Sequence, residues 1–158
     1  MIFTAYEISK EPIEEDDYLT EDSCSDYLDK YNFDYCKDAD CDDRLSDIEH
    51  FPAIFPKGMF TKVGENSFRY NGGLEKWKVS YCIKLKALAA DLSTEGVLND
   101  TTLYRIKSLI ENPLGDYMFY FGESFPSLYR GDSVMRLFIS NLNVGDIIYI
   151  GGVVYFHY

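Results

Sequence analysis

"DIIYIGGVVYFHY" (residues 146–158) has the strongest β-strand character of any stretch in this chain. Two runs of β-branched and aromatic residues, "DIIYI" and "VVYFHY", flank Gly151 and Gly152. A tight two-residue turn needs positive φ angles, which glycine adopts without strain, and such flanking runs are typical of hairpin strands. The stretch therefore predicts a C-terminal β-hairpin with its turn at Gly151-Gly152.

The segments just before this hairpin predict a buried strand and then a helix. "DYMFYFG" (116–122) is a short apolar run, as expected of a buried strand. "DSVMRLFISNL" (132–142) begins with Asp132, a favourable N-cap residue. Its apolar positions share one helical face: Val134, Leu137, Phe138 and Leu142.

The middle of the chain predicts two further helices. "GLEKWKVSYCIKLKALAADL" has apolar residues at helical spacing, which favours a helix over 74–92, although the alternation over 77–85 leaves a strand open. A second helix is expected over 101–111, capped by Asn99 or Asp100 and ended before Pro113. Its expected buried side consists of Leu103, Ile106, Leu109 and Ile110.

The first seventy residues predict a strand at 2–8, a helix and a hairpin. Leu28, Tyr31 and Tyr35 lie at helical spacing, and Ser23 or Ser25 could cap that helix. "HFPAIFPKG" (50–58) contains two prolines and is interpreted as a linker. "MFTKV" and "SFRY", separated by Gly64-Glu65-Asn66, predict the hairpin.

Together these elements predict a single α+β domain over residues 1–158. We expect a small antiparallel sheet with the C-terminal hairpin, packed on about three helices. A chain of 158 residues with 46% hydrophobic content can bury a core of this kind. The first residues show neither a basic region nor a long apolar run, so we expect a soluble, cytoplasmic protein.

Charge is distributed very unevenly along the chain. Residues 1–50 hold 17 acidic and 4 basic side chains, a net charge of −13, whereas residues 51–158 hold 10 acidic and 11 basic ones. The segment 13–50 is thus acidic and tyrosine-rich, and residues 51–158 form a near-neutral body. Such a segment repels nucleic acids and membrane surfaces and attracts basic proteins.

The acidic segment therefore predicts a protein-binding surface. Carboxylates displayed along helices can imitate a row of phosphates, and tyrosines add contact area at low entropic cost. The expected partner is a basic protein that handles nucleic acid, such as a nuclease. The predicted contact residues are Glu14, Glu15, Asp16, Asp17, Tyr18, Asp22, Asp26, Tyr27, Asp29, Tyr31, Asp34, Asp38, Asp40, Asp42 and Asp43.

"DADCDDRLSDIE" (38–49) offers a calcium site as an alternative. Asp38, Asp40, Asp42 and Glu49 occupy positions 1, 3, 5 and 12 of an EF-hand-type loop, whose carboxylates supply the oxygens that Ca²⁺ prefers. Position 6 holds Asp43, where the sharp turn of such loops calls for glycine. No other cofactor is expected.

The cysteines and histidines form no familiar motif. Cys24, Cys36, Cys41 and His50 are separated by 11, 4 and 8 residues, which matches no compact zinc knuckle. Reduced thiols are therefore expected, Cys82 included. His157 alternates with Tyr155 in the last run of residues, which favours a packed or surface side chain over a catalytic base.

Residues 125–158, with Tyr129-Arg130-Gly131 at the end of an expected strand, resemble a segment of the mono-ADP-ribosyltransferases. In that family a helix and then "VGD" follow, as they do here. The resemblance implies that Arg130 holds the phosphates of NAD. It departs from the family where a Ser-Thr-Ser motif should stand, because this chain has "VVYFHY", and the glutamate motif beyond it is missing. It therefore implies a partial, NAD-binding relative without the catalytic carboxylate.

Three functions follow as hypotheses. The first is a non-enzymatic inhibitor that sequesters a basic partner, with DNA mimicry as one way to do so. Such a protein would be similar in size and charge to phage anti-defence proteins and to the immunity proteins of toxin pairs. The second is a transferase-like protein that binds NAD through Arg130. The third is a calcium-stabilised interaction module.

Overall fold

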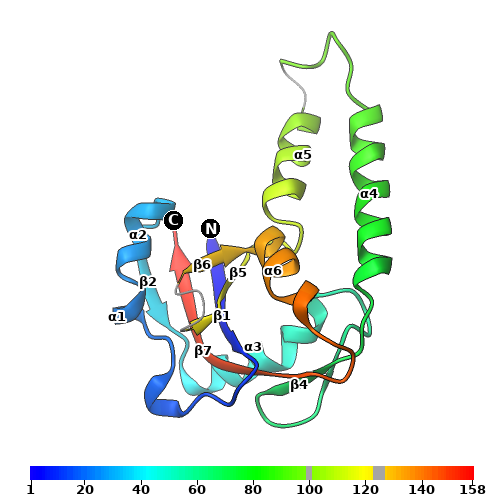
Figure 1. Cartoon of the computed structure of the whole chain (residues 1–158). Coiled ribbons are helices and arrows are strands. Elements are labelled where there is room, and N and C mark those ends of the chain that lie inside the picture. The colour runs from blue at the N-terminus through cyan, green and yellow to red at the C-terminus, as the bar shows by residue number, and fades with distance from the viewer. Residues whose placement is uncertain (99–100, 123–126) are drawn as a thin grey trace.

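The computed structural model describes residues 1–98, 101–122 and 127–158, and they form the α+β fold that the sequence predicts (Figure 1). The strands are β1 (Ile2–Ser9), β2 (Tyr35–Asp38), β3 (Phe60–Lys62), β4 (Ser67–Tyr70), β5 (Tyr117–Tyr120), β6 (Leu128–Arg130) and β7 (Ile147–His157). The helices are α1 (Glu21–Cys24), α2 (Asp26–Tyr31), α3 (Cys41–Ile54), α4 (Leu74–Ala90), α5 (Thr101–Glu111) and α6 (Gly131–Leu137), with short 3₁₀ turns η1 (Glu15–Asp17) and η3 (Ile139–Asn141).

The C-terminal stretch is one continuous strand, so the predicted hairpin is wrong. Gly151 and Gly152 lie inside β7, and neither has a positive φ angle. β7 pairs with β1 along one edge and with β4 and then β2 along the other. It is therefore a central strand, which explains why both runs of residues around the glycines are apolar.

The sheet has seven strands in the order β3-β4-β7-β1-β5-β6, with β2 also paired to β7, and it is larger than the small sheet expected. Pairing between β1 and β5 is parallel, and the other described pairs are antiparallel. The predicted strand at 2–8, the strand within 116–122 and the hairpin of β3 and β4 are confirmed.

Side chains alternate between two cores, one on each face of the sheet. On one face Tyr6 and Val153 pack with Ile48 and Phe51 of α3 and with Val134 of α6. The opposite face is covered by the acidic segment, whose buried side chains meet the sheet there: Leu19, Cys24 and Phe33 against Phe3, Ala5, Met118, Val154 and Phe156. The acidic segment is thus an integral layer of the fold.

The linker predicted at 50–58 is wrong, because α3 continues to Ile54 with Pro52 inside it. A proline in a helix removes one backbone hydrogen bond and costs stability. Here Ile48 and Phe51, both fully buried, and Phe55 just beyond the helix bind this segment to the core. Burial of these large side chains outweighs the local preference of proline.

Asp40 caps the start of α3, and its removal gives a first testable prediction. Its carboxylate accepts a hydrogen bond from the backbone N–H of Asp43 at 2.9 Å. Asp40→Ala leaves that donor without a partner and should lower the free energy of unfolding by about 1 kcal/mol in denaturant titrations. Asp42→Ala, in the same exposed turn but without this bond, is the control and should change stability by less than half as much.

The helix predicted around 23–35 is broken into shorter pieces. Asn32 adopts a left-handed conformation, with φ of 56°, which ends α2 and lets the chain turn into β2. Tyr35 therefore lies in a strand and does not share a helical face with Leu28. Ser23 lies inside α1, and Ser25 makes no side-chain capping bond.

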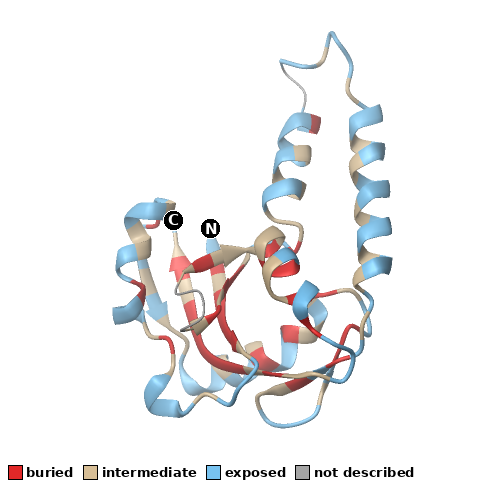
Figure 2. Cartoon of the chain, in the orientation of Figure 1, coloured by how far each residue is buried: buried red, intermediate tan, exposed pale blue. Residues whose placement is uncertain are grey.

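Helices α4 and α5 are confirmed, and residues 77–85 are helical. The two helices, hereafter the arm, project from the body as a pair (Figure 1) and are mostly exposed (Figure 2). Of the predicted buried side of α5, Leu103 and Ile110 are 42% and 50% exposed, whereas Ile106 and Leu109 are half-buried. The proposed caps Asn99 and Asp100 lie outside the described residues. No helix in the described ranges is long and apolar enough to cross a membrane.

Helix α6 is shorter than the predicted 132–142 and begins one residue earlier. Arg130 occupies the N-cap position. Asp132, which was predicted to be the cap, lies inside the first turn instead. The chain packs tightly at the start of this helix: a Cβ on Gly131 would lie 3.0 Å from the backbone nitrogen of Leu114. Leu142 is buried, but it follows the η3 turn.

Candidate functional site

The sheet has a gap beside Gly151 and Gly152, where side chains replace a strand. β4 pairs with β7 as far as Tyr149, and β2 begins at Val154. Between them, Arg44 Nε donates to the carbonyl oxygen of Gly151 at 2.9 Å, and Asn66 Nδ2 donates to that of Ile150 at 3.1 Å. We call this place the glycine junction.

Glu7 of β1 completes the glycine junction from inside the protein. Its side chain is only 5% exposed, and Oε2 accepts hydrogen bonds from the backbone N–H groups of Leu19 and Gly152, both at 2.8 Å. Burial raises the pKa of this carboxyl, although the two hydrogen bonds oppose the rise. Glu7 thereby ties the acidic segment to the central strand.

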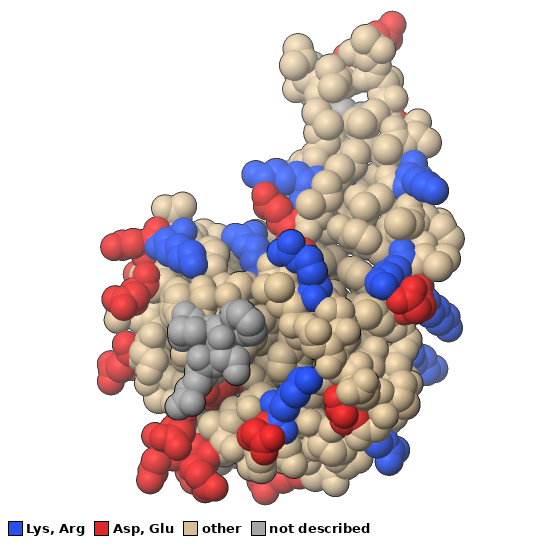
Figure 3. Space-filling view, in the orientation of Figure 1, with Lys and Arg blue, Asp and Glu red and all other residues tan. Residues whose placement is uncertain are grey.

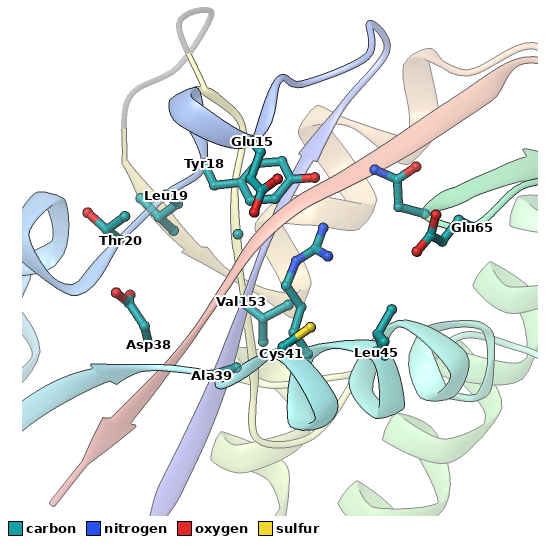
Figure 4. Close-up of a pocket in the computed structure, with 13 residues that line it drawn as sticks. Glu15, Tyr18, Leu19, Thr20, Asp38, Ala39, Cys41, Leu45, Glu65 and Val153 are labelled. Atoms are coloured by element: carbon teal, nitrogen blue, oxygen red, sulfur yellow. The ribbon is translucent and has the colours of Figure 1, made fainter.

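A half-open pocket of about 590 Å³ lies over the glycine junction (Figure 4). Arg44 lies within it, with its guanidinium 4.5 Å from the centre of the Tyr18 ring. The carboxylates of Glu15, Asp38 and Glu65 also line the pocket. Because Arg44 is already held by backbone carbonyls and an aromatic ring, the pocket offers an incoming group mainly negative charge.

Most of the predicted contact carboxylates lie on one exposed layer, which we call the acidic lobe (residues 13–43). This lobe holds 13 acidic and 2 basic side chains, a net charge of −11. Figure 3 shows acidic atoms gathered over the side formed by η1, α1 and α2. Twelve of its carboxylates are exposed: Glu14, Glu15, Asp16, Asp17, Glu21, Asp22, Asp26, Asp29, Asp34, Asp40, Asp42 and Asp43. Within the described ranges, no carboxylate of the lobe forms a salt bridge.

Two acidic residues on the contact list have structural roles. The backbone N–H of Glu21 donates to Asp38 Oδ1 at 2.6 Å, and that of Asp38 donates to Glu21 Oε2 at 3.1 Å. This reciprocal pair joins α1 to β2. Burial is the main cause that raises the pKa of Asp38. Asp40 is the cap of α3. The carboxylates of Asp38 and Asp40 both accept hydrogen bonds within the fold, so neither is available to a binding partner alone.

The three tyrosines on the contact list are half-buried. The Tyr31 hydroxyl donates to the carbonyl oxygen of Leu128 at 2.6 Å, Tyr18 lies against Arg44, and Tyr27 packs against the core of its face. Their rings stabilise the lobe, and carboxylates form most of its outer surface.

The interpretation of residues 38–49 as a loop is wrong, because residues 41–54 are helical. Asp38 ends β2, Asp40 caps α3, and Asp42 and Glu49 are two turns apart on that helix. Glu49 forms a salt bridge with Lys62. Among the described residues, no three His, Cys, Asp or Glu side chains are grouped as metal ligands would be.

The cysteines and histidines are dispersed. All four cysteines are free, with Cys24 buried and Cys41 and Cys82 exposed. His50 Nε2 lies 3.2 Å from the Tyr117 hydroxyl, and His157 stacks on Tyr35 with ring centres 4.3 Å apart.

Arg130 ends β6 and directly precedes α6. Its guanidinium is 3.8 Å from Glu111 Oε2, hydrogen-bonds to the Asn112 amide oxygen at 3.4 Å and lies 5.7 Å from the Phe3 ring centre. It lines a second pocket, of about 400 Å³, between α5 and the chain termini. These contacts already hold the arginine within the fold.

Stability should depend on pH through three shifted carboxyls. Burial is the main cause that raises the pKa of Glu7, Asp38 and Asp47. The folded state therefore binds protons more readily than the unfolded chain, so the free energy of unfolding should fall as pH rises above 4.5, the ordinary pKa of glutamate. We expect wild-type protein to be more stable at about pH 5 than at about pH 8 in denaturant titrations.

The Glu7→Gln variant isolates one contribution to this pH dependence. Its amide oxygen can still accept both hydrogen bonds, but the side chain does not titrate. The fall in stability between the two pH values should be smaller in this variant. An equal fall in both proteins would contradict the role given to Glu7.

No family model matches the chain, and neither the curated proteins nor the solved structures with which it was compared include a match. Its function must therefore be inferred from the acidic lobe, the glycine junction and the arm themselves.

Proposed function

We propose that this protein is a non-enzymatic binder, whose acidic lobe docks on a basic surface of a cytoplasmic nucleic-acid-handling protein and blocks it. The observation that supports this most strongly is the set of twelve exposed carboxylates on the acidic lobe without a salt-bridge partner in the described chain. An inhibitor of the anti-defence or immunity type, acting by DNA mimicry, fits such a surface.

Electrostatics favours a basic partner over solvent alone. Like charges this close raise the electrostatic energy of the free lobe, and a basic surface lowers it on binding while releasing counterions. The negative pocket over the glycine junction would accept a lysine or arginine side chain from that partner, beside Glu15 and Glu65.

Rigidity supports the same proposal. Glu7, the Glu21–Asp38 pair and the pairing of β2 with β7 hold the lobe on the sheet. A surface that is already ordered loses little conformational entropy on binding, so its charges remain spaced for one partner shape.

The test uses a triple variant that removes three negative charges without removing a salt bridge. Asp22→Asn, Asp26→Asn and Asp29→Asn preserve side-chain shape, and none of these carboxylates forms a salt bridge. In affinity capture from the source cells followed by titration of the captured protein, this variant should bind about tenfold more weakly, because three rim charges at about 0.5 kcal/mol each contribute about 1.5 kcal/mol.

The control removes three exposed carboxylates elsewhere: Asp91→Asn, Glu95→Gln and Asp116→Asn. It has the same net charge as the lobe variant and should bind like wild type. Equal weakening in both variants would mean that only total charge matters, and the proposed surface would be wrong. Thermal shift with NAD and with Ca²⁺ tests the other two functions, and the binder proposal expects neither ligand to raise Tm.

A further inference from the structure

A pocket at the base of the arm is lined mainly by lysines and apolar side chains. It is half-open, has a volume of about 510 Å³ and lies where α4 meets the turn that follows α3 (Figure 1). Such a volume holds a small molecule. Lys57 of that turn and Lys76 and Lys84 of α4 line it. Its described lining contains no aspartate or glutamate, although the chain has a net charge of −12. We call this site the lysine pocket.

The positive charge of the lysine pocket is not neutralised within the fold. None of its three lysines forms a salt bridge with any residue of the described ranges. Glu75, the one acidic residue in the first turn of α4, pairs with Lys78 and does not line the pocket. An anion that enters the pocket therefore meets three lysines and no competing carboxylate on the lining, so its binding is electrostatically favourable.

Helix α4 presents its polar groups to the lysine pocket in one row. Lys76, Ser80 and Lys84 follow each other at intervals of four residues, so they lie on one face of the helix over about 12 Å. Gly73, the N-cap of this 17-residue helix, also lines the pocket. The positive end of the helix dipole therefore lies beside the lysines and adds to their attraction for an anion. The row suits an extended anion, such as a chain of phosphates, better than a single small ion.

The rest of the lysine pocket is largely apolar and includes an aromatic ring. Phe55, Met59 and Leu114 are buried residues of its lining. Trp77 also lines it and is half-buried. The Trp77 ring stacks on Tyr81, with ring centres 4.9 Å apart, but Tyr81 does not line the pocket, so the indole meets the pocket away from that contact. Nucleobases stack favourably on aromatic side chains, and this wall can accept one.

We propose that the lysine pocket binds a nucleoside triphosphate, with its phosphates along the lysine row of α4 and its base against Trp77. An inorganic anion would leave the apolar wall uncovered, and a neutral aromatic molecule would leave the lysines without a partner. NAD is not expected to bind, because its bridging diphosphate carries less charge than a terminal triphosphate. This inference goes beyond the binder proposal, since the pocket is lined by the arm and the body and not by the acidic lobe.

The test is a fluorescence titration of the full chain with magnesium-free ATP, because Trp77 is the only tryptophan of the chain and reports on the lysine pocket directly. We expect a saturable change with a Kd below about 1 mM. Lys76→Gln together with Lys84→Gln should raise this Kd about tenfold, as the loss of two exposed charge pairs predicts. Lys78→Gln together with Lys86→Gln removes the same charge from the same helix outside the pocket and should raise it less than about twofold.

The four substituted lysines are exposed, so circular dichroism and Tm without ligand should match wild type in both double variants. Adenosine and inorganic triphosphate should each bind at least about tenfold more weakly than ATP. No saturable binding of ATP, equal weakening in the two double variants, or equal affinity for either fragment would each overturn the proposal. The triple variant of the acidic lobe should bind ATP like wild type, so failure here and failure of the partner-capture test are distinguishable.

Discussion

Replacing Gly152 with alanine should destabilise the protein by about 3 kcal/mol, although only one methyl group is added. A Cβ at this position would lie 2.1 Å from the carbonyl oxygen of Leu19 and 2.8 Å from its backbone nitrogen. Both are backbone atoms, so no side-chain rotation relieves the overlap. Moving Leu19 away stretches the hydrogen bond that its backbone N–H donates to Glu7, and this buried N–H group loses its partner.

Denaturant unfolding of Gly152→Ala beside Gly145→Ala measures this effect. Gly145 has φ of 98°, and a Cβ there meets nothing within 4 Å, so its substitution tests backbone strain without a clash. We expect a loss of about 1 kcal/mol for Gly145→Ala. Equal losses in the two variants would mean that close approach to Leu19 is not the reason for glycine in β7.

Phe51→Ala should lower the free energy of unfolding by about 4 kcal/mol, the largest single effect we expect. Phe51 is fully buried where α3 meets the sheet, and its ring centre lies 5.1 to 5.8 Å from those of Tyr6, Phe55, Phe60 and Phe68. Truncation leaves a cavity among four other rings, which cannot all close over it.

The matched control for this substitution is Leu45→Ala on the same helix. Leu45 is 37% exposed and lines the pocket over the glycine junction, so its truncation should cost less than about 1 kcal/mol. Chemical denaturation of both variants gives the comparison directly. A loss below about 2 kcal/mol for Phe51→Ala would contradict the view that α3 is held by this aromatic core.

Local sequence patterns predicted those helices and strands whose own apolar periodicity agrees with the structure they adopt in the fold. The helices at 74–90 and 101–111 have long apolar periods, and the strand at 2–9 alternates, so each could be identified from its own residues. The α+β class followed from their order.

The Gly-Gly pair shows why the central strand could not be predicted in the same way. Glycine occurs in turns and also where another backbone passes close by, and only the position of Leu19, more than a hundred residues earlier, distinguishes the two. A central strand with neighbouring strands along both edges is apolar throughout its length. Its sequence pattern is therefore the same as that of two apolar hairpin strands.

The acidic lobe was located from charge alone, but the residues that hold it were missed. Glu7 offered a signal, since an acidic residue in the apolar run "IFTAYEI" must find buried donors. Arg44 and Asn66 gave none, because their partners are backbone carbonyls of β7. Pro52 was misleading, since the buried phenylalanines around it decide the local structure.

Competition with DNA tests the central claim, that the acidic lobe occupies the nucleic-acid surface of its partner. The protein captured by the wild-type chain would be titrated with it in the presence of increasing duplex DNA, at about 0.15 M salt. We predict mutually exclusive binding, with a Kd that rises steeply with salt and that Asp22→Asn, Asp26→Asn and Asp29→Asn together raise about tenfold. A ternary complex with DNA, or unchanged affinity of that variant, would contradict the account.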